Sequence, residues 1–303
     1  MRLVALLPLV ACCGKPAQQV APAHERALAD ARPTDARPVD AAAHASLPTS
    51  SYADLASALV ATIPADARVI GFGELHARTD RAQVRTTLSR FTADGLPAIA
   101  GKLSDLVIET WLIDKGREKT ATTASATVDA TMRRPIETKN EIAELADAAR
   151  KAGIQPHAMR VTCDDYARIA PPGKPMDVPA MLTLTTSELG RIATEAVIHR
   201  DREPSHKPWI ALYGGALHND RFPDNGVADW SYAAKADAAS SNHFVEIDLI
   251  VPELADHDDV LAKQAWYPLL AVPSTTLRVW KRGERSFVIL FPRSPVSPAG
   301  SAS

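Results

Sequence analysis

The architecture follows from ten residues, which read Ala67-Arg68-Val69-Ile70-Gly71-Phe72-Gly73-Glu74-Leu75-His76. An apolar run gives way to glycine and then to polar side chains, as a buried strand does where it reaches the edge of a sheet. The same order recurs farther along, where residues 209–214 lead into Gly215-Ala216-Leu217-His218. Because ligands of open α/β sheets bind at the carboxyl ends of the strands, the two histidines predict one site built from two strand ends.

Apolar runs that alternate with amphipathic segments indicate the rest of the fold. Strands are expected at residues 67–72, 105–109, 154–163, 209–213 and 244–250, and helices at 51–63, 78–94, 136–152 and 186–200, the last capped by Ser187. This alternation predicts an α/β fold with a mainly parallel central sheet flanked by helices. Residues 276–281 and 286–291 flank a compact turn and predict a C-terminal antiparallel hairpin, which makes the sheet mixed. Residues 114–131 lack a strong period, and a helical insertion or a mobile flap is expected there.

The first residues predict export and a lipid anchor. Met1-Arg2 precede an apolar run that is too short to span a bilayer, which needs roughly 20 apolar residues, and that suits a secretory signal over residues 1–11. Leu9-Val10-Ala11-Cys12 resembles the lipobox of bacterial lipoproteins, which implies that Cys12 carries lipid. Position 13 is cysteine rather than aspartate, so resemblance to the sorting rule favours the outer membrane, on its periplasmic or its surface face.

Composition divides the remaining chain into a tether, one domain and a tail. Residues 12–50 are rich in alanine and proline and predict a disordered tether, and residues 292–303 predict a disordered tail. Residues 51–291 suit a single α/β domain. The three cysteines imply no disulfide framework. The formal net charge of −2 without a basic stripe makes nucleic acid an unsuitable partner.

Parallel strands would bring several polar side chains to one edge, namely Glu74, His76, Glu109, Asp164, Asp165 and His218, with Asn219 and Asp220 behind. Two histidines and a carboxylate, here His76, His218 and Glu109, can ligate a divalent transition metal such as Mn, Co, Zn or Fe and leave a position for water. The same residues could act without metal, with a histidine as general base and a glutamate that orients it. The residues leave both mechanisms open.

Each of these residues also has a plain structural explanation. A single Gly-x-x-His is a weak signal, and only its repetition after two buried strands favours function. Glu74 could cap a following helix, and Asp164 and Asp165 could be ordinary loop residues. Asp256-His257-Asp258-Asp259 is better explained as the acidic start of a helix, and no nucleophile signature accompanies Cys163.

Gly73-Glu74-Leu75-His76, the strand that ends in Glu109, and Gly215-Ala216-Leu217-His218-Asn219 together resemble the superfamily of erythromycin esterases, ChaN-like haem-uptake lipoproteins and Tiki/TraB proteins. The Tiki branch implies a metal-dependent protease with His76, Glu109 and His218 around the metal. The esterase branch implies ester hydrolysis with His76 as base, assisted by Glu74. The ChaN-like branch implies haem binding in a lipoprotein, but its members carry further histidines after the first motif, and residues 77–81 contain none.

These observations predict a lipid-anchored, extracytoplasmic hydrolase that acts on an ester or peptide bond by water activation at a site of two histidines and a glutamate, with a divalent metal. A haem- or metal-binding uptake lipoprotein and an inactive surface interaction module are the alternatives. Specificity is expected to reside in loops at residues 114–134 and 170–179. The substrate and the oligomeric state are not fixed by the sequence.

Overall fold

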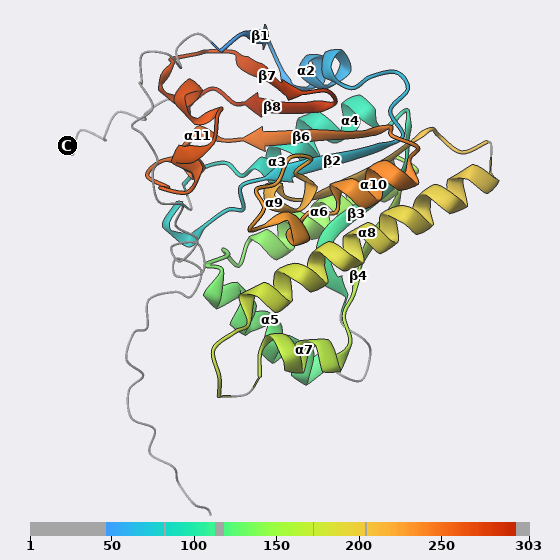
Figure 1. Ribbon diagram of the computed structural model, residues 1–303, viewed down its shortest axis with the longest axis vertical. Helices are drawn as coiled ribbons and strands as arrows, with labels where there is room; N and C mark the ends of the chain where they lie inside the picture. The colour runs from blue at the N-terminus through green and yellow to red at the C-terminus, as the bar shows by residue number, and fades with distance from the viewer. Residues whose placement is uncertain (1–46, 82, 113–117, 172, 204, 295–303) are drawn as a thin grey trace, which may run out of the picture. The chain divides into compact units, whose positions relative to one another are not determined.

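A computed structural model describes residues 47–294, except residues 82, 113–117, 172 and 204 (Figure 1). All described residues belong to one compact unit of the chain. The predicted signal peptide, the lipidated Cys12, residues 12–46 of the tether and the tail beyond residue 294 lie outside the described residues. In the described part of the chain, no helix combines the length and the apolar character that crossing a membrane requires.

The described strands form one eight-stranded sheet in the order β1-β7-β8-β6-β2-β5-β3-β4 (Figure 1). Their bounds are Thr49–Tyr52 for β1, Val69–Glu74 for β2, Leu103–Leu112 for β3, Gln155–Arg160 for β4, Trp209–Gly215 for β5, Phe244–Ile250 for β6, Leu277–Gly283 for β7 and Ser286–Leu290 for β8. The six neighbours from β8 to β4 pair in parallel, and β7 pairs antiparallel with β1 and β8. The predicted α/β class, with a mainly parallel sheet and a C-terminal hairpin, is therefore confirmed.

Helices cover both faces of this sheet (Figure 1). One face carries α2, α3, α4 and α6, which span Leu55–Thr62, Thr87–Arg90, Leu96–Ile99 and Thr138–Lys151. The other carries α8, Val178–Arg202, and α10, Ala233–Ala239. The remaining α-helices are α5, α7, α9 and α11, which span Glu118–Thr131, Cys163–Ile169, Ala216–Asn219 and Pro252–Ala255.

The central strands are apolar on both faces because each face is covered. Along β2, Ile70 and Phe72 pack into the core beneath α2 and α4, while Val69 packs against the α8 side with Ala193. Strands buried on both faces become continuous apolar runs, which is why β2, β5 and β6 could be recognised in the sequence.

Three predicted elements differ in the structure. Residues 78–94 are not one helix: a 3-10 turn at Thr79–Arg81, α3, a π-helical turn at Phe91–Gly95 and α4 follow one another, and the helical path continues past Gly95. Helix α8 begins at Val178 and is capped by Asp177, whose carboxylate accepts from the Ala180 N–H at 2.9 Å. The predicted Ser187 cap is therefore wrong, since the proline-rich stretch before it leads directly into the helix.

The third difference affects the predicted site. Strand β4 ends at Arg160, and the chain turns at once into α7. Thr162 and Asp165 form a capping box at the start of that helix, and Asp164 lies exposed in its first turn. These two aspartates thus serve a helix start and do not extend β4.

Candidate active site

Glycines at the carboxyl ends of β2 and β5 make room for the site. The two strands are in register, so that Gly73 pairs with Gly214 and Glu74 with Gly215. A Cβ on Gly73 would lie 2.7 Å from both Ala216 Cα and Asn219 Oδ1. The close approach of α9 to the sheet therefore requires glycine at this position.

The glycines of β5 admit two of the predicted site residues. A Cβ on Gly214 would lie 2.5 Å from Glu109 Oε2, and one on Gly215 would lie 2.9 Å from His76 Nε2. Glu109 comes from β3, which does not end there as predicted but continues to Leu112. It lies within the stretch between Ile108 and Trp111 where the pairing of β3 with β4 shifts register. The glycines thus bring side chains from β2 and β3 together over β5.

Glu109 is the central carboxylate. Its side chain is 9% exposed and lies 3.6 Å from His76 Nε2. Oε2 accepts from the Gly215 N–H at 2.6 Å, and Oε1 accepts from Arg134 at 3.3 Å. Burial alone would raise the pKa of Glu109, but His76, His218 and Arg134 hold it well below its usual value. Glu109 is therefore ionised at neutral pH.

His76 is held between an acceptor and a donor. Its Nδ1 lies 2.9 Å from Glu74 Oε1, and Glu74 Oε2 accepts from the Tyr213 hydroxyl at 2.6 Å. Its Nε2 lies 2.9 Å from the Arg134 guanidinium. Because guanidinium only donates, this contact fits the neutral ring with hydrogen on Nδ1. Burial and Arg134 lower the pKa of His76, but Glu109 and Glu74 outweigh them and raise it.

His218 is oriented by its own network on the α8 side. Its Nδ1 lies 2.9 Å from the Trp230 carbonyl oxygen and 2.9 Å from Thr186 Oγ1. The carbonyl can only accept, so Nδ1 carries the hydrogen of the neutral ring and Nε2 keeps its lone pair. Burial lowers the pKa of His218, although the charge of Glu109 opposes this. His218 is thus a neutral imidazole with Nε2 available as a base.

Arg134 was not identified from the sequence as a site residue. It follows α5 in a turn where Arg133 has a φ of 51° and the Arg134 N–H donates to Asp129 O at 2.9 Å. Its Nε is buried without a hydrogen-bond partner in the described part of the chain. Only the predicted importance of residues 114–134 for specificity pointed to this segment, because no sequence period places an arginine over β2 and β3.

The donor set fits a metal poorly as it stands. A metal bound to His76, Glu109 and His218 would need His76 Nε2 and a Glu109 oxygen as ligands. Arg134 occupies that place, with its nitrogen 2.9 Å from His76 Nε2 and 3.3 Å from Glu109 Oε1. A second cation there would meet a fixed positive charge. Among the described residues, no group of three or more His, Cys, Asp and Glu is arranged for a metal ion, and the predicted metal remains a prediction.

The other predicted residues lie behind or away from this cluster. Asn219 is buried beneath Gly73, where its Nδ2 donates to Gly71 O at 3.2 Å. Asp220 faces β7 and pairs with Arg282 at 2.7 Å. Asp164 and Asp165 contact no site residue in the described part of the chain, which corrects their predicted delivery by β4.

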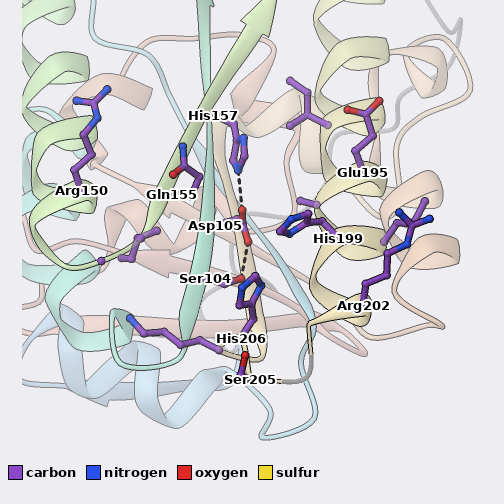
Figure 2. Close-up of a pocket in the computed structure, with 16 residues that line it drawn as sticks. Ser104, Asp105, Arg150, Gln155, His157, Glu195, His199, Arg202, Ser205 and His206 are labelled. Carbon is purple, nitrogen blue, oxygen red and sulfur yellow. Dashed lines mark hydrogen bonds and ion pairs between the residues drawn. The ribbon is translucent and has the colours of Figure 1, made fainter.

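A separate cavity of about 1140 Å³ lies between β3, β4, α6 and α8 (Figure 2). His157 Nε2 pairs with Asp105 Oδ1 at 2.7 Å, and Ser104 Oγ donates to Asp105 Oδ2 at 2.6 Å. Arg150 and His199 line it from the last turns of α6 and α8, where basic side chains are favoured beside the exposed helix carbonyls. Its basic lining thus has a structural explanation.

No family model matches the chain, and no curated protein matches it. Among solved structures, the type III effector HopBA1 is similar over 82% of this chain and 99% of that chain, with 15% identity and a TM-score of 0.44. A protein from Bacillus cereus is similar over 61% of this chain and 66% of that chain, with 10% identity and a TM-score of 0.31. These similarities carry no argument about function.

Proposed function

We propose that the chain is a hydrolase that cleaves an ester or peptide bond with water activated by a histidine. One observation carries the proposal: two buried or half-buried imidazoles face the same glutamate, and their surroundings shift their pKa values in opposite directions. Titratable neighbours with separated pKa values are the usual signature of an acid and a base in one site. The predicted place of action, at the cell envelope on a lipid anchor, belongs to the same proposal.

His218 is the base in this proposal, since its Nε2 has a lone pair and Nδ1–H is fixed on the Trp230 carbonyl. It takes a proton from water as the water oxygen attacks the substrate carbonyl carbon. Ionised Glu109 stabilises the imidazolium that forms. Negative charge develops on the substrate carbonyl oxygen. Arg134 stabilises it by moving its hydrogen bond from His76 Nε2 to that oxygen.

His76 is the acid, because the carboxylates of Glu109 and Glu74 favour its protonated form. Once Arg134 turns to the substrate, His76 Nε2 is free and takes up a proton from solvent, which it donates to the leaving alkoxide or amine. His218 then returns to solvent the proton that it took from water, and both imidazoles are reset. Each step uses side chains of this chain, so the proposal needs no metal.

The test compares hydrolysis of a panel of aryl esters and a panel of peptides by the wild type and by His218→Gln, His76→Gln and Arg134→Gln. We expect each variant to lose most of its activity, since removal of one oxyanion-stabilising donor alone typically lowers kcat by about 10²–10³-fold. The matched control is His157→Gln, because His157 also pairs with a carboxylate, at 2.7 Å, but in the separate cavity. Equal activity in the site variants and the control would contradict the proposal.

Metal content is the second readout of the same experiment. We expect activity to persist in the presence of a chelator. Near-stoichiometric metal that is lost in both histidine variants, together with activity that requires it, would replace the Arg134 mechanism with the metal site predicted from the sequence.

A further inference from the structure

Asp248 is a buried carboxyl group that the proposed reaction does not use. It lies on β6 opposite Gly73 and is 6% exposed. Asn219, 1% exposed, donates from Nδ2 to Asp248 Oδ1 at 3.1 Å. Its other terminal atom, Oδ1, is buried without a hydrogen-bond partner in the described part of the chain. A buried acceptor without a donor costs free energy. A neighbouring group is therefore expected to donate a hydrogen to Asn219 Oδ1.

Around Asp248, the carboxyl groups outnumber the cationic side chains that could pair with them. Arg282 contacts Asp220 at 2.7 Å and Glu246 at 3.2 Å. Arg221 directs its guanidinium to Asp237 instead. Within the described residues, Asp248 has no ion-pair partner. An ionised Asp248 would therefore be a buried charge without compensation.

We propose that Asp248 is held as a neutral carboxylic acid and donates its hydroxyl hydrogen to Asn219 Oδ1, which completes a two-point acid–amide pair. The Nδ2–H···Oδ1 contact is one half of this pair, and the unpartnered Asn219 Oδ1 is the acceptor for the other half. The pair supplies the missing hydrogen and removes the uncompensated charge in one arrangement.

The titratable groups that face Asp248 support the neutral form. Burial and the charge of Glu246 on the same strand raise the pKa of Asp248 well above its usual value, and Asp220 acts in the same direction. The Asn219 amide and the charge of Arg282 on β7 oppose this without reversing it. Tyr232, next to α10, is also near, and burial raises its pKa well above the ordinary value, so its hydroxyl stays neutral.

The pair positions His218 from behind. Asn219 is the next residue after His218 and ends α9, whose Ala216 lies against Gly73. The Trp230 carbonyl fixes the His218 ring from one side, and the acid–amide pair fixes the backbone that carries it. Asp248 contacts none of the proposed reacting atoms, so it is a positioning residue.

The test uses the full chain and the variants Asp248→Asn and Asp248→Leu. Asparagine keeps the acceptor and supplies an N–H for Asn219 Oδ1 without any proton uptake, whereas leucine removes both halves of the pair. Because the folded wild type binds a proton at Asp248 that the unfolded chain releases, this group contributes less stability as pH rises from the unfolded pKa towards the folded one. We therefore expect the difference in Tm, Asp248→Asn minus wild type, to increase as the pH is raised from mildly acidic to mildly alkaline.

Two NMR signals complete the test. The ¹³Cγ signal of Asp248, assigned by its loss in Asp248→Asn, should have the shift of a protonated carboxyl at neutral pH. The imidazole signals of His218 should be retained in Asp248→Asn and displaced in Asp248→Leu. An ionised ¹³Cγ shift at neutral pH, or a loss of Tm in Asp248→Asn that equals the loss in Asp248→Leu at every pH, would overturn the inference. None of these readouts depends on the hydrolase proposal.

Discussion

The two histidines show how one side chain acquires two different properties from its neighbours. His76 is 26% exposed and lies between Glu74 and Glu109, so that nearby carboxylates favour its charged form. His218 is 4% exposed and bonded to a carbonyl and a hydroxyl, so that burial favours its neutral form. The difference comes from the groups that surround each ring, and the Gly-x-x-His pattern does not specify those groups.

This difference predicts a bell-shaped pH dependence of kcat/KM. Activity should rise with pH as His218 loses its proton, with an apparent pKa below the ordinary histidine value, because burial depresses it. It should fall again at higher pH, because His76 has to take up a proton on Nε2 to act as the acid, and its neighbours raise the pKa for that uptake above the ordinary value. The measurement is kcat/KM against pH with the best substrate of the panel. A profile that rises to a plateau without an alkaline fall would contradict the acid role of His76.

Tyr213 gives a prediction about stability. Its hydroxyl donates to Glu74 Oε2 at 2.6 Å, and Glu74 is 7% exposed. Tyr213→Phe leaves a buried carboxylate oxygen without this donor, which should lower the free energy of unfolding by about 1–3 kcal/mol. Chemical denaturation measures the loss. Tyr52→Phe is the control, since the Tyr52 hydroxyl has no hydrogen bond in the described part of the chain, and an equal loss in both variants would contradict the explanation.

At the scale of single residues, the sequence predicted those site residues that lie on or directly after a strand. His76 and His218 follow apolar strands and Glu109 lies within one, and the structure brings the three side chains close together. Arg134 and Thr186 could not be predicted, because they approach from outside the sheet, on the turn after α5 and on the face of α8. The spacing of a strand or a helix does not determine which distant side chain reaches over it.

At the scale of elements, the glycines of β2 and β5 determine how closely α9 and the side chains of Glu109 and His76 approach the strand ends. Gly73, Gly214 and Gly215 each lie where a Cβ would meet a neighbouring group at less than 3 Å. The position of the turn that carries His218 therefore depends on the lack of a side chain at Gly73 as well as on the hydrogen bonds of His218.

Gly73→Ala should destabilise the fold and displace His218. The added Cβ would clash with Asp248 and lie 2.7 Å from Ala216 Cα, a backbone atom that cannot rotate away. Overpacking of this kind typically costs about 1–3 kcal/mol, and denaturation with the His218 imidazole signals would report both effects.

Gly101→Ala is the matched control for this substitution. No heavy atom lies within 4 Å of a Cβ built at Gly101, and its backbone φ is not in the left-handed region that glycine favours. We expect little change in its stability. A Gly73→Ala protein as stable as Gly101→Ala would show that α9 does not need this close approach.

The sequence predicted long, continuous elements better than interrupted ones. Strands β2, β5 and β6 are apolar runs buried on both faces and were recognised. Residues 78–94 were predicted as one helix, but the structure divides them among a 3-10 turn, α3 and the π-helical turn at Phe91–Gly95, which adds a residue to one turn. Short β1 was missed, since its four residues Thr-Ser-Ser-Tyr carry no apolar pattern and pair only with β7.

At the scale of the whole molecule, the sheet order brings distant parts of the chain to one edge. Strand β2 lies between β5 and β6, and β3 lies on the far side of β5. Glu74, Glu109 and Gly215 become neighbours only through this order. The mixed class was predictable from the alternation of elements, whereas the order of strands was not, because local patterns do not specify which strands pair.

The lipid anchor gives a prediction for the intact protein. Cys12 lies outside the described residues, and its role rests on the resemblance of Leu9-Val10-Ala11-Cys12 to a lipobox. Cys12→Ser should move the protein from the membrane fraction to a soluble or uncleaved form, as fractionation and mass spectrometry would detect. The neighbouring Cys13→Ser is the control and should remain anchored. Equal membrane retention in both variants would contradict lipidation at Cys12.

The three glycines at the strand ends, Gly73, Gly214 and Gly215, also bear on how such a site could be transplanted into another protein. Adding two histidines, two glutamates and an arginine to the end of an unrelated parallel sheet would not reproduce it, because ordinary side chains on the two central strands would hold the incoming groups apart. A designer would have to remove those side chains first and accept a weaker sheet until the incoming turn was in place. Acquisition of the site by stepwise mutation would meet the same obstacle in the same order.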